Sequence, residues 1–121
     1  MAKVSIVLPT LNRPLLLARA VRSELAQTFT DYEVIVVDDG DKPPVKNIVE
    51  DLHDKRFRYI AHDSPDRGGS ATRNTGIKAS QGEFIAFLDD DDEWLAEKLA
   101  LQVDALSSFG KEVGFCVTGA E

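Results

Sequence analysis

The sequence predicts an α/β domain: a mainly parallel β-sheet with helices on both of its faces. Apolar runs typical of buried strands alternate along the 121 residues with amphipathic segments typical of helices. The runs are nearly continuously apolar, as expected of parallel strands that are covered on both sides. There is no internal repeat or interdomain linker, so we expect residues 1–121 to form one domain.

Five apolar runs are the predicted strands. The first is expected to end at Pro9, because proline lacks the N–H group that a strand ladder uses. The second is closed by Asp38-Asp39-Gly40, and the fourth by a run of aspartates. The predicted strands are residues 4–8, 33–37, 57–61, 83–88 and 113–117.

Four amphipathic segments are the predicted helices, at residues 14–26, 45–52, 70–80 and 92–110. Pro14 suits the first turn of the first helix, and Gly82 suits the stop of the third. The second is expected to begin after Pro43-Pro44. The last is expected to begin near Asp92 and to bury one apolar side chain per turn, namely Leu95, Leu99, Val103 and Leu106.

Composition excludes several classes of protein. Fourteen basic and 21 acidic residues give a formal net charge of -7, which disfavours nucleic acid as a partner. No apolar stretch approaches the roughly 20 residues of a membrane span, and the N-terminus lacks a signal-peptide pattern. We therefore expect a soluble, cytoplasmic segment. The single cysteine, Cys116, is expected in the core.

Four consecutive carboxylates, Asp89 to Asp92, follow the fourth strand. Like charges this close repel one another unless a cation lies among them, and Mn²⁺ or Mg²⁺ with oxygen ligands is the simplest candidate. We predict Asp91 as the direct metal ligand, Asp89 as a supporting ligand and Asp90 near sugar or ribose hydroxyls. Asp92 suits the N-cap of the next helix. The alternative is a solvated acidic turn.

Polar residues also follow the first and second strands, at positions 9–13 and 38–41. If the first strand lies between the second and the fourth, all three loops meet at one crevice, where open α/β sheets bind ligands. There Asp39 can accept a hydrogen bond from the N–H of a base such as uracil, although Asp-Gly is also a common turn pair. Asp38 is expected to brace the turn.

A further helix start follows Gly68-Gly69. Such a start presents backbone N–H groups to an anion, and Arg73, one turn in, can pair with a phosphate or with a carboxylate of the site. The alternative is a glycine-rich loop with a surface arginine. His53, His62 and Trp94 have no partner pattern, and we interpret them as structural.

Five stretches together make the chain resemble the family 2 glycosyltransferases with the GT-A type of nucleotide-sugar-binding fold. In order they are residues 4–13 (VSIVLPTLNR), 27–29 (QTF), 32–40 (YEVIVVDDG), 69–77 (GSATRNTGI) and 82–94 (GEFIAFLDDDDEW). The resemblance covers nearly the whole chain, and its pieces occur in the expected order.

The resemblance implies that Thr10 and Asp39 hold the base of a nucleotide-sugar donor, with a UDP-sugar expected first. It implies that residues 89–91 form an Asp-x-Asp element whose metal bridges the donor diphosphate. From the loop after the first strand, we include Pro9, Asn12 and Arg13 among the nucleotide-binding candidates. Family members usually invert the anomeric centre and use an acidic general base on the acceptor hydroxyl.

The resemblance also implies a second half, which binds a saccharide or lipid-linked acceptor and carries the general base. The sequence ends at Glu121, before such a half, and no candidate base is found. We therefore expect the donor-binding part of a longer enzyme, which alone is inactive and can self-associate, and whose parent can be membrane-associated. Residues 66–68 read DRG where Asn-x-Gly is common, so this loop departs from the pattern.

An alternative function is a phospho-receiver signalling domain, which also uses clustered aspartates and Mg²⁺. Receivers place an acidic pair after their first strand, whereas here Asp38-Asp39 follows the second. Receivers also place a lysine after the fifth strand, and here Lys111 precedes it. The positions of the charged residues therefore favour the nucleotide-sugar hypothesis.

Overall fold

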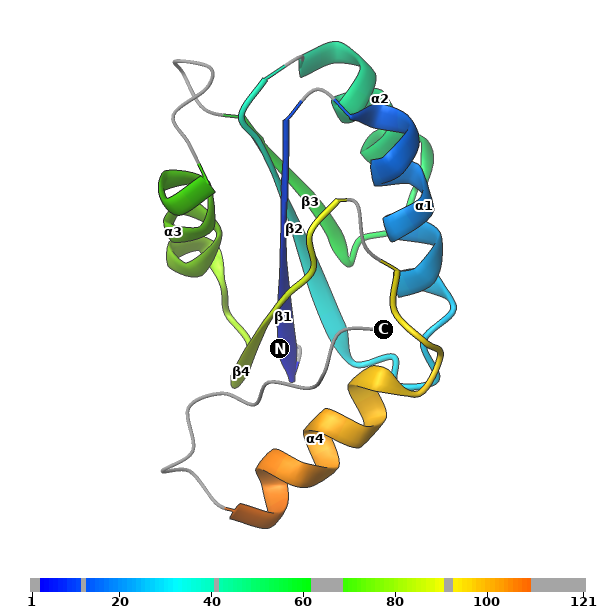
Figure 1. The fold of residues 1–121 in the computed structure, drawn as a ribbon, viewed down its shortest axis with the longest axis vertical. Coiled ribbons are helices and arrows are strands. Elements are labelled where there is room, and N and C mark those ends of the chain that lie inside the picture. Colours follow the sequence, from blue (N-terminus) through cyan, green and yellow to red (C-terminus); the bar gives the residue numbers. More distant parts are fainter. Residues whose placement is uncertain (1–2, 12, 41, 62–68, 91–92, 110–121) are drawn as a thin grey trace.

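The computed structural model describes residues 3–11, 13–40, 42–61, 69–90 and 93–109. It confirms the predicted class: a four-stranded sheet with α3 on one face and α1 and α2 on the other (Figure 1). In chain order the elements are β1 (Val4–Thr10), α1 (Pro14–Leu25), β2 (Tyr32–Asp38), α2 (Lys42–Asp51), β3 (Phe57–Ala61), α3 (Gly69–Ala79), β4 (Phe84–Phe87) and α4 (Lys98–Phe109).

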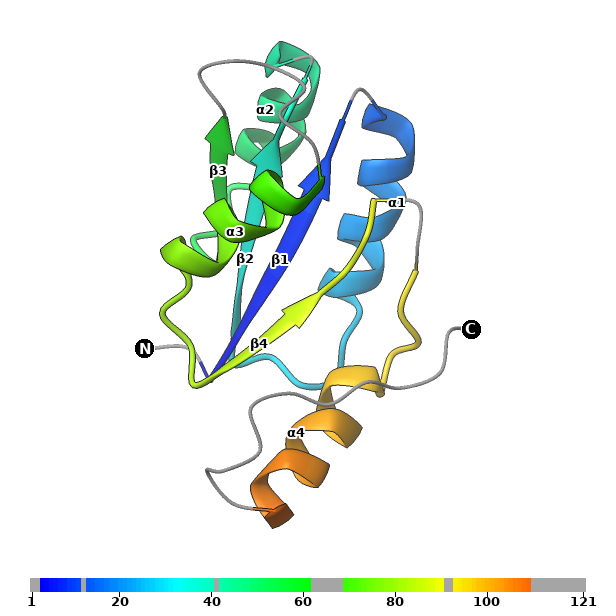
Figure 2. The ribbon, with the colours of Figure 1, turned by 60° about the vertical axis from the view of Figure 1, so that its left-hand side comes forward.

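The strand order is β3-β2-β1-β4, and each neighbouring pair is parallel. Val7 of β1 pairs with Ile35 of β2 on one side and with Phe87 of β4 on the other. The first strand therefore lies between the second and the fourth, which is the condition under which the three polar loops were expected to meet, and the carboxyl ends of these strands lie at one edge of the sheet (Figure 2). The predicted strand at 113–117, with Cys116, lies outside the described residues.

The core lies on both faces of β1 and β2, whose apolar side chains are almost fully buried. From α1, Leu17, Ala20 and Val21 pack onto one face, at the helical spacing that the sequence shows. On the other face α3 approaches β1 so closely that a Cβ at Gly76 would overlap Val7. Among the described residues, no helix is long and apolar enough to cross a membrane.

β1 continues through Pro9 to Thr10, so the prediction that it ends at Pro9 is wrong. Leu88 N–H donates a hydrogen bond to the Val7 carbonyl. The backbone groups of alternate residues in a strand point to the same side, so those of Val7 and Pro9 both face β4. The pairing of β4 with β1 stops at Val7 and Phe87. The missing N–H of Pro9 therefore falls where no partner strand needs it, and proline is tolerated.

Two helix starts also differ from the prediction. α2 begins at Lys42 and includes both prolines, because the first turn of a helix needs no N–H donors. α4 begins at Lys98 rather than near Asp92, and Leu95, predicted to be buried, is 71% exposed. The side chain of Gln27 donates a hydrogen bond to the Leu95 carbonyl and so holds the residues just before Lys98 outside the helix.

Candidate functional site

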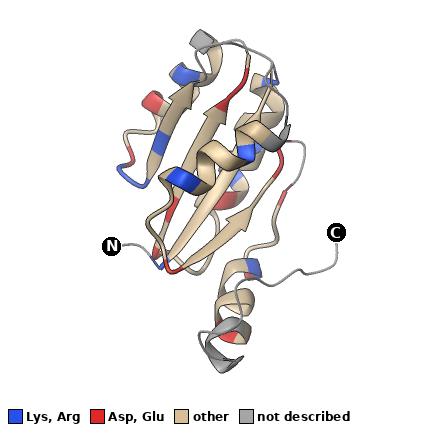
Figure 3. Cartoon of the chain, turned by 90° about the vertical axis from the view of Figure 1, so that its left-hand side faces the viewer, with Lys and Arg blue, Asp and Glu red and all other residues tan. Residues whose placement is uncertain are grey.

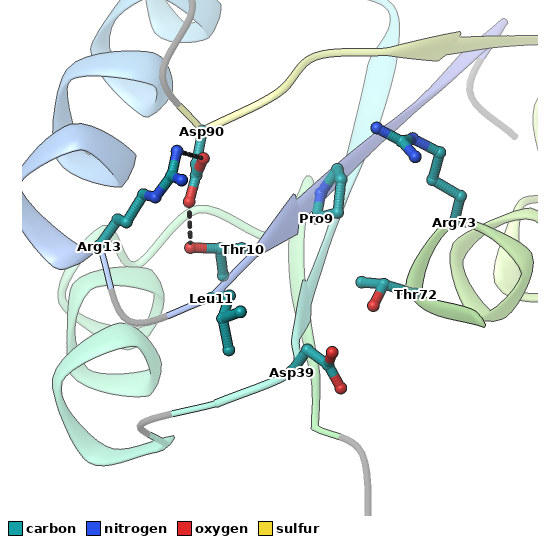
Figure 4. A pocket seen from close by; sticks show the side chains of 8 residues that line it. All are labelled: Pro9, Thr10, Leu11, Arg13, Asp39, Thr72, Arg73 and Asp90. Carbon is teal, nitrogen blue, oxygen red and sulfur yellow. Dashed lines mark hydrogen bonds and ion pairs between the residues drawn. The ribbon is translucent and has the colours of Figure 1, made fainter. Parts of the chain in front are cut away.

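A pocket opens at the carboxyl ends of the strands, beside the first turns of α1 and α3 (Figure 4). It measures about 170 Å³. It brings together most of the predicted nucleotide-binding residues with two that were not predicted, Leu11 and Thr72. Its lining consists of Pro9, Thr10, Leu11, Arg13, Asp39, Thr72, Arg73 and Asp90. The convergence of the three loops is therefore observed in the structure.

Asp90 is buried and held from two directions. The Thr10 hydroxyl donates a hydrogen bond to its Oδ2 at 2.9 Å, and Arg13 Nη1 lies 3.4 Å from its Oδ1. Figure 4 shows Asp90 and Arg13 on one side of the end of β1, and Asp39 and Thr72 on the other. The position of the Asp90 carboxylate is thus fixed by residues from the neighbouring strand end and from the start of α1.

Asp38 braces the turn after β2, as the sequence predicts, and Asp39 lies at the pocket. Asp38 accepts hydrogen bonds from the Gly40 N–H at 2.9 Å and from the Tyr59 hydroxyl at 2.6 Å, so it braces the turn. Burial, together with this carboxylate, raises the pKa of Tyr59. Asp39 is buried at the pocket wall, and its own N–H donates to the Thr10 carbonyl at 2.9 Å.

Asp89 turns to the opposite face of the sheet from Asp90. Arg73 Nη2, from α3, lies 3.2 Å from Asp89 Oδ1, and the two side chains are 44% and 48% exposed. Of the two partners predicted for Arg73, the structure shows the carboxylate. Figure 3 shows the same pattern in charge: acidic residues follow β2 and β4, and basic residues lie on α3.

The donor chemistry of this edge fits a hard divalent cation, because Asp89 offers a half-exposed carboxylate beside the pocket. Within the described ranges no three His, Cys, Asp or Glu side chains lie close enough together to hold an ion. Asp91, the predicted direct ligand, lies outside those ranges, as do Asn12, Asp92 and His62. The predicted metal ligands therefore stay predictions.

The positions of Thr72 and Leu11 in the sequence could have predicted that they line the pocket. Each is the immediate neighbour of a residue that was predicted, Arg73 and Thr10. Trp94 is buried in the core with the Lys98 ammonium 5.3 Å from its ring centre, which confirms its structural role.

Comparison with known proteins identifies the class to which this fold and pocket belong. The family model for glycosyl transferase family 2 matches residues 5–119. The chain therefore belongs to glycosyl transferase family 2, as its sequence resemblance implied. This membership favours the nucleotide-sugar hypothesis over the phospho-receiver alternative.

Two curated relatives are bacterial glucosyltransferases. The chain is 36% identical over 124 residues to the GalNAc(5)-diNAcBac-PP-undecaprenol beta-1,3-glucosyltransferase of Campylobacter jejuni, and covers 40% of it. All of this chain takes part in that match. It is 34% identical over 103 residues to the Escherichia coli UDP-Glc:alpha-D-GlcNAc-diphosphoundecaprenol beta-1,3-glucosyltransferase WfgD, covering 85% of this chain and 40% of WfgD. The chain thus spans about 40% of the length of these relatives.

Solved structures confirm the GT-A fold. S. aureus TarS 1-349 in complex with UDP-GlcNAc superimposes with a TM-score of 0.75 at 30% identity, over 85% of this chain and 31% of TarS. The mannosyltransferase PcManGT from Pyrobaculum calidifontis, solved with GDP-Man and Mn²⁺, gives a TM-score of 0.74 at 23% identity. That match covers 84% of this chain and 31% of PcManGT, and it concerns the fold alone.

Proposed function

We propose that the pocket binds the nucleoside end of a nucleotide-diphosphate sugar, with a UDP-sugar as the donor. The observation that carries the proposal is the convergence of Thr10, Asp39 and Asp90 from three strand ends on one pocket. At about 170 Å³ the pocket is smaller than the roughly 300–1,000 Å³ of sites that enclose a whole small ligand. It accordingly holds part of the donor. The complex of TarS with UDP-GlcNAc supports the nucleotide.

Different residues of the pocket would contact different parts of the donor. Asp39, buried at the wall, accepts the N–H of the base, and this contact favours uracil over a base whose ring nitrogen is an acceptor, because two acceptors repel each other. Asp90 offers lone pairs to the ribose hydroxyls while Thr10 and Arg13 keep it in place. Arg73 faces the diphosphate, for which a guanidinium is a suitable partner.

A divalent cation, Mn²⁺ or Mg²⁺, completes the proposed donor site. Asp91 would hold it, with Asp89 as the supporting ligand. When bound, such an ion neutralises the charge that develops on the departing nucleoside diphosphate. The contribution of this chain is to supply carboxylate oxygens and to hold the cluster at the strand end, where Arg73 balances part of its charge in the absence of an ion.

For the full-length parent we propose inverting transfer of the sugar to an acceptor hydroxyl, of the hexosyltransferase type, in polysaccharide biosynthesis. Residues 1–121 are then the donor-binding portion. The acceptor site and the general base would belong to the part of the longer relatives that this chain does not match. The undecaprenol-linked substrates in the names of two relatives support a lipid-linked saccharide acceptor and a parent that works at a membrane.

Calorimetric titration with UDP, with and without Mn²⁺, tests the proposal. We expect binding that is at least about tenfold tighter with Mn²⁺, because an ion held by the carboxylates would attract the negatively charged diphosphate. Asp91→Asn should remove this gain, whereas Asp51→Asn, at the exposed end of α2, should leave it unchanged. Equally weak binding with and without the ion, or full binding by Asp91→Asn, would contradict the proposal.

A further inference from the structure

The chain that follows β4 runs back beside α1 towards the opposite end of the sheet (Figures 1 and 2). Asp90, at its start, is held at the pocket by Thr10 and Arg13. Its far part is attached beyond the other end of α1, where Gln27 and Thr28 lie. We call the described residues 93–97 the return segment. The chain after β4 is therefore held near both ends of α1.

Gln27 makes the far attachment with both ends of its amide. The side chain is buried, and its Nε2 donates to the Leu95 carbonyl at 2.7 Å and to the Ser23 carbonyl at 3.2 Å. Its Oε1 accepts the Leu99 N–H at 3.0 Å, so the same amide satisfies a free N–H in the first turn of α4. Gln27 therefore ties α1 to the return segment and to α4 together.

Thr28 adds a second tie next to the first. Its N–H donates to the Ala96 carbonyl at 2.9 Å, and its hydroxyl lies 3.3 Å from the same oxygen. Between these contacts and the pocket, the buried ring of Trp94 packs into the core. The return segment is thus held by side-chain amide, backbone and aromatic contacts, all on the side of α1.

The far attachment lies close to the pocket along the chain. Leu95 and Ala96, which Gln27 and Thr28 bind, are only five and six positions after Asp90. Loss of the far attachment would increase the conformational freedom of the return segment.

We propose that Gln27 is a positioning residue for the donor site: its amide fixes the far end of the return segment and thereby pre-organises the carboxylates that precede this segment. The inference rests on the proposed binding of UDP with a divalent cation. Without Gln27 the segment must be ordered when the ligand binds, and this ordering weakens the apparent affinity. The family resemblance includes residues 27–29 but assigns them no role.

The test compares Gln27→Met, which keeps the length of the side chain and removes both polar ends, with Val49→Ala. Val49 is buried in α2 and has no part in the return segment, so its truncation lowers stability elsewhere. Urea unfolding identifies conditions in which every variant is fully folded. There we expect the affinity for UDP with Mn²⁺ to fall about tenfold in Gln27→Met and to stay unchanged in Val49→Ala.

Trp94 supplies a second readout that does not depend on binding, since it is the one tryptophan of the chain and lies in the return segment. Acrylamide should quench its fluorescence more strongly in folded Gln27→Met than in the wild type, and saturation with UDP and Mn²⁺ should reverse part of that gain. Unchanged quenching, equal affinity in Gln27→Met, or an equal loss in Val49→Ala would overturn the inference. If the wild type binds no UDP, the proposed function fails, and the quenching still decides whether Gln27 anchors the segment.

Discussion

The hydroxyl of Thr10 donates a hydrogen bond to the carboxylate of Asp90 at 2.9 Å, between residues that are 80 positions apart in the sequence. Thr10 is the last residue of β1, and Asp90 follows the neighbouring strand β4. The bond joins two of the three loops that form the pocket. Because both residues are buried, it also limits the orientations open to the Asp90 carboxylate.

Thr10→Val should weaken UDP binding several-fold, because it removes the hydroxyl and leaves Asp90 held by its ion pair with Arg13. The loss of a bond to a charged group should also lower the free energy of unfolding by about 1.5–3 kcal/mol. Thr75→Val is the matched control, since its hydroxyl bonds to Ala71 within α3. Calorimetry and urea unfolding measure the two effects. Unchanged affinity in Thr10→Val would show that the bond does not serve the pocket.

Asp39 should decide which base is bound. Uracil presents an N–H that the carboxylate accepts, whereas the corresponding ring nitrogen of cytosine is an acceptor and repels the carboxylate of Asp39. The wild type should therefore prefer UDP to CDP by at least about tenfold. Asp39→Ala should lose most of this preference and bind both nucleotides weakly. Competition titrations measure the ratio, and a preference that survives in Asp39→Ala would place the base elsewhere.

Removal of the charge of Arg73 should affect binding more than stability. Its ion pair with Asp89 is half exposed, and such pairs contribute at most about 1 kcal/mol. Arg73→Gln should therefore leave urea unfolding nearly unchanged while UDP binds about tenfold more weakly, through loss of a phosphate partner. Lys46→Gln makes the same charge change on an exposed pair in α2 and should alter neither quantity. Equal effects of the two variants would indicate only a general charge effect.

The buried carboxyl of Glu24 should give the free energy of unfolding an unusual dependence on pH. Both of its carboxylate oxygens are buried in α1 and have no hydrogen-bond partner among the described residues. Burial raises its pKa well above the ordinary value of 4.5. The folded protein thus keeps a proton that the unfolded chain loses, so the contribution of Glu24 to the free energy of unfolding falls as pH rises from 4.5 towards the raised pKa.

Glu24→Met should remove this fall and raise the free energy of unfolding at pH 7 by about 1–3 kcal/mol, because an unsatisfied buried group is replaced by an apolar one of similar size. The same change at the exposed Glu97 should leave the pH dependence as it is. Urea unfolding across pH 4 to 8 makes the measurement. A profile of Glu24→Met parallel to that of the wild type would contradict a buried, protonated carboxyl.

Local patterns in the sequence were enough for the order of the elements. The continuous apolar run at residues 34–37 marked β2, a short mainly apolar stretch marked β3, and the four-residue spacing of Leu17 and Val21 marked the buried face of α1. The boundaries that failed depend on distant residues. Whether Pro9 ends β1 depends on where β4 stops, and where α4 begins depends on Gln27.

The sequence by itself determined the α/β class and the set of polar strand ends, because hydrophobic period and turn chemistry act over a few neighbouring residues. Only the tertiary structure decided how the adjacent carboxylates Asp89 and Asp90 divide between Arg73 and Arg13, and that Gln27 holds the chain beyond them. Which arginine each aspartate pairs with depends on packing between elements far apart in the chain, so the local sequence does not predict it.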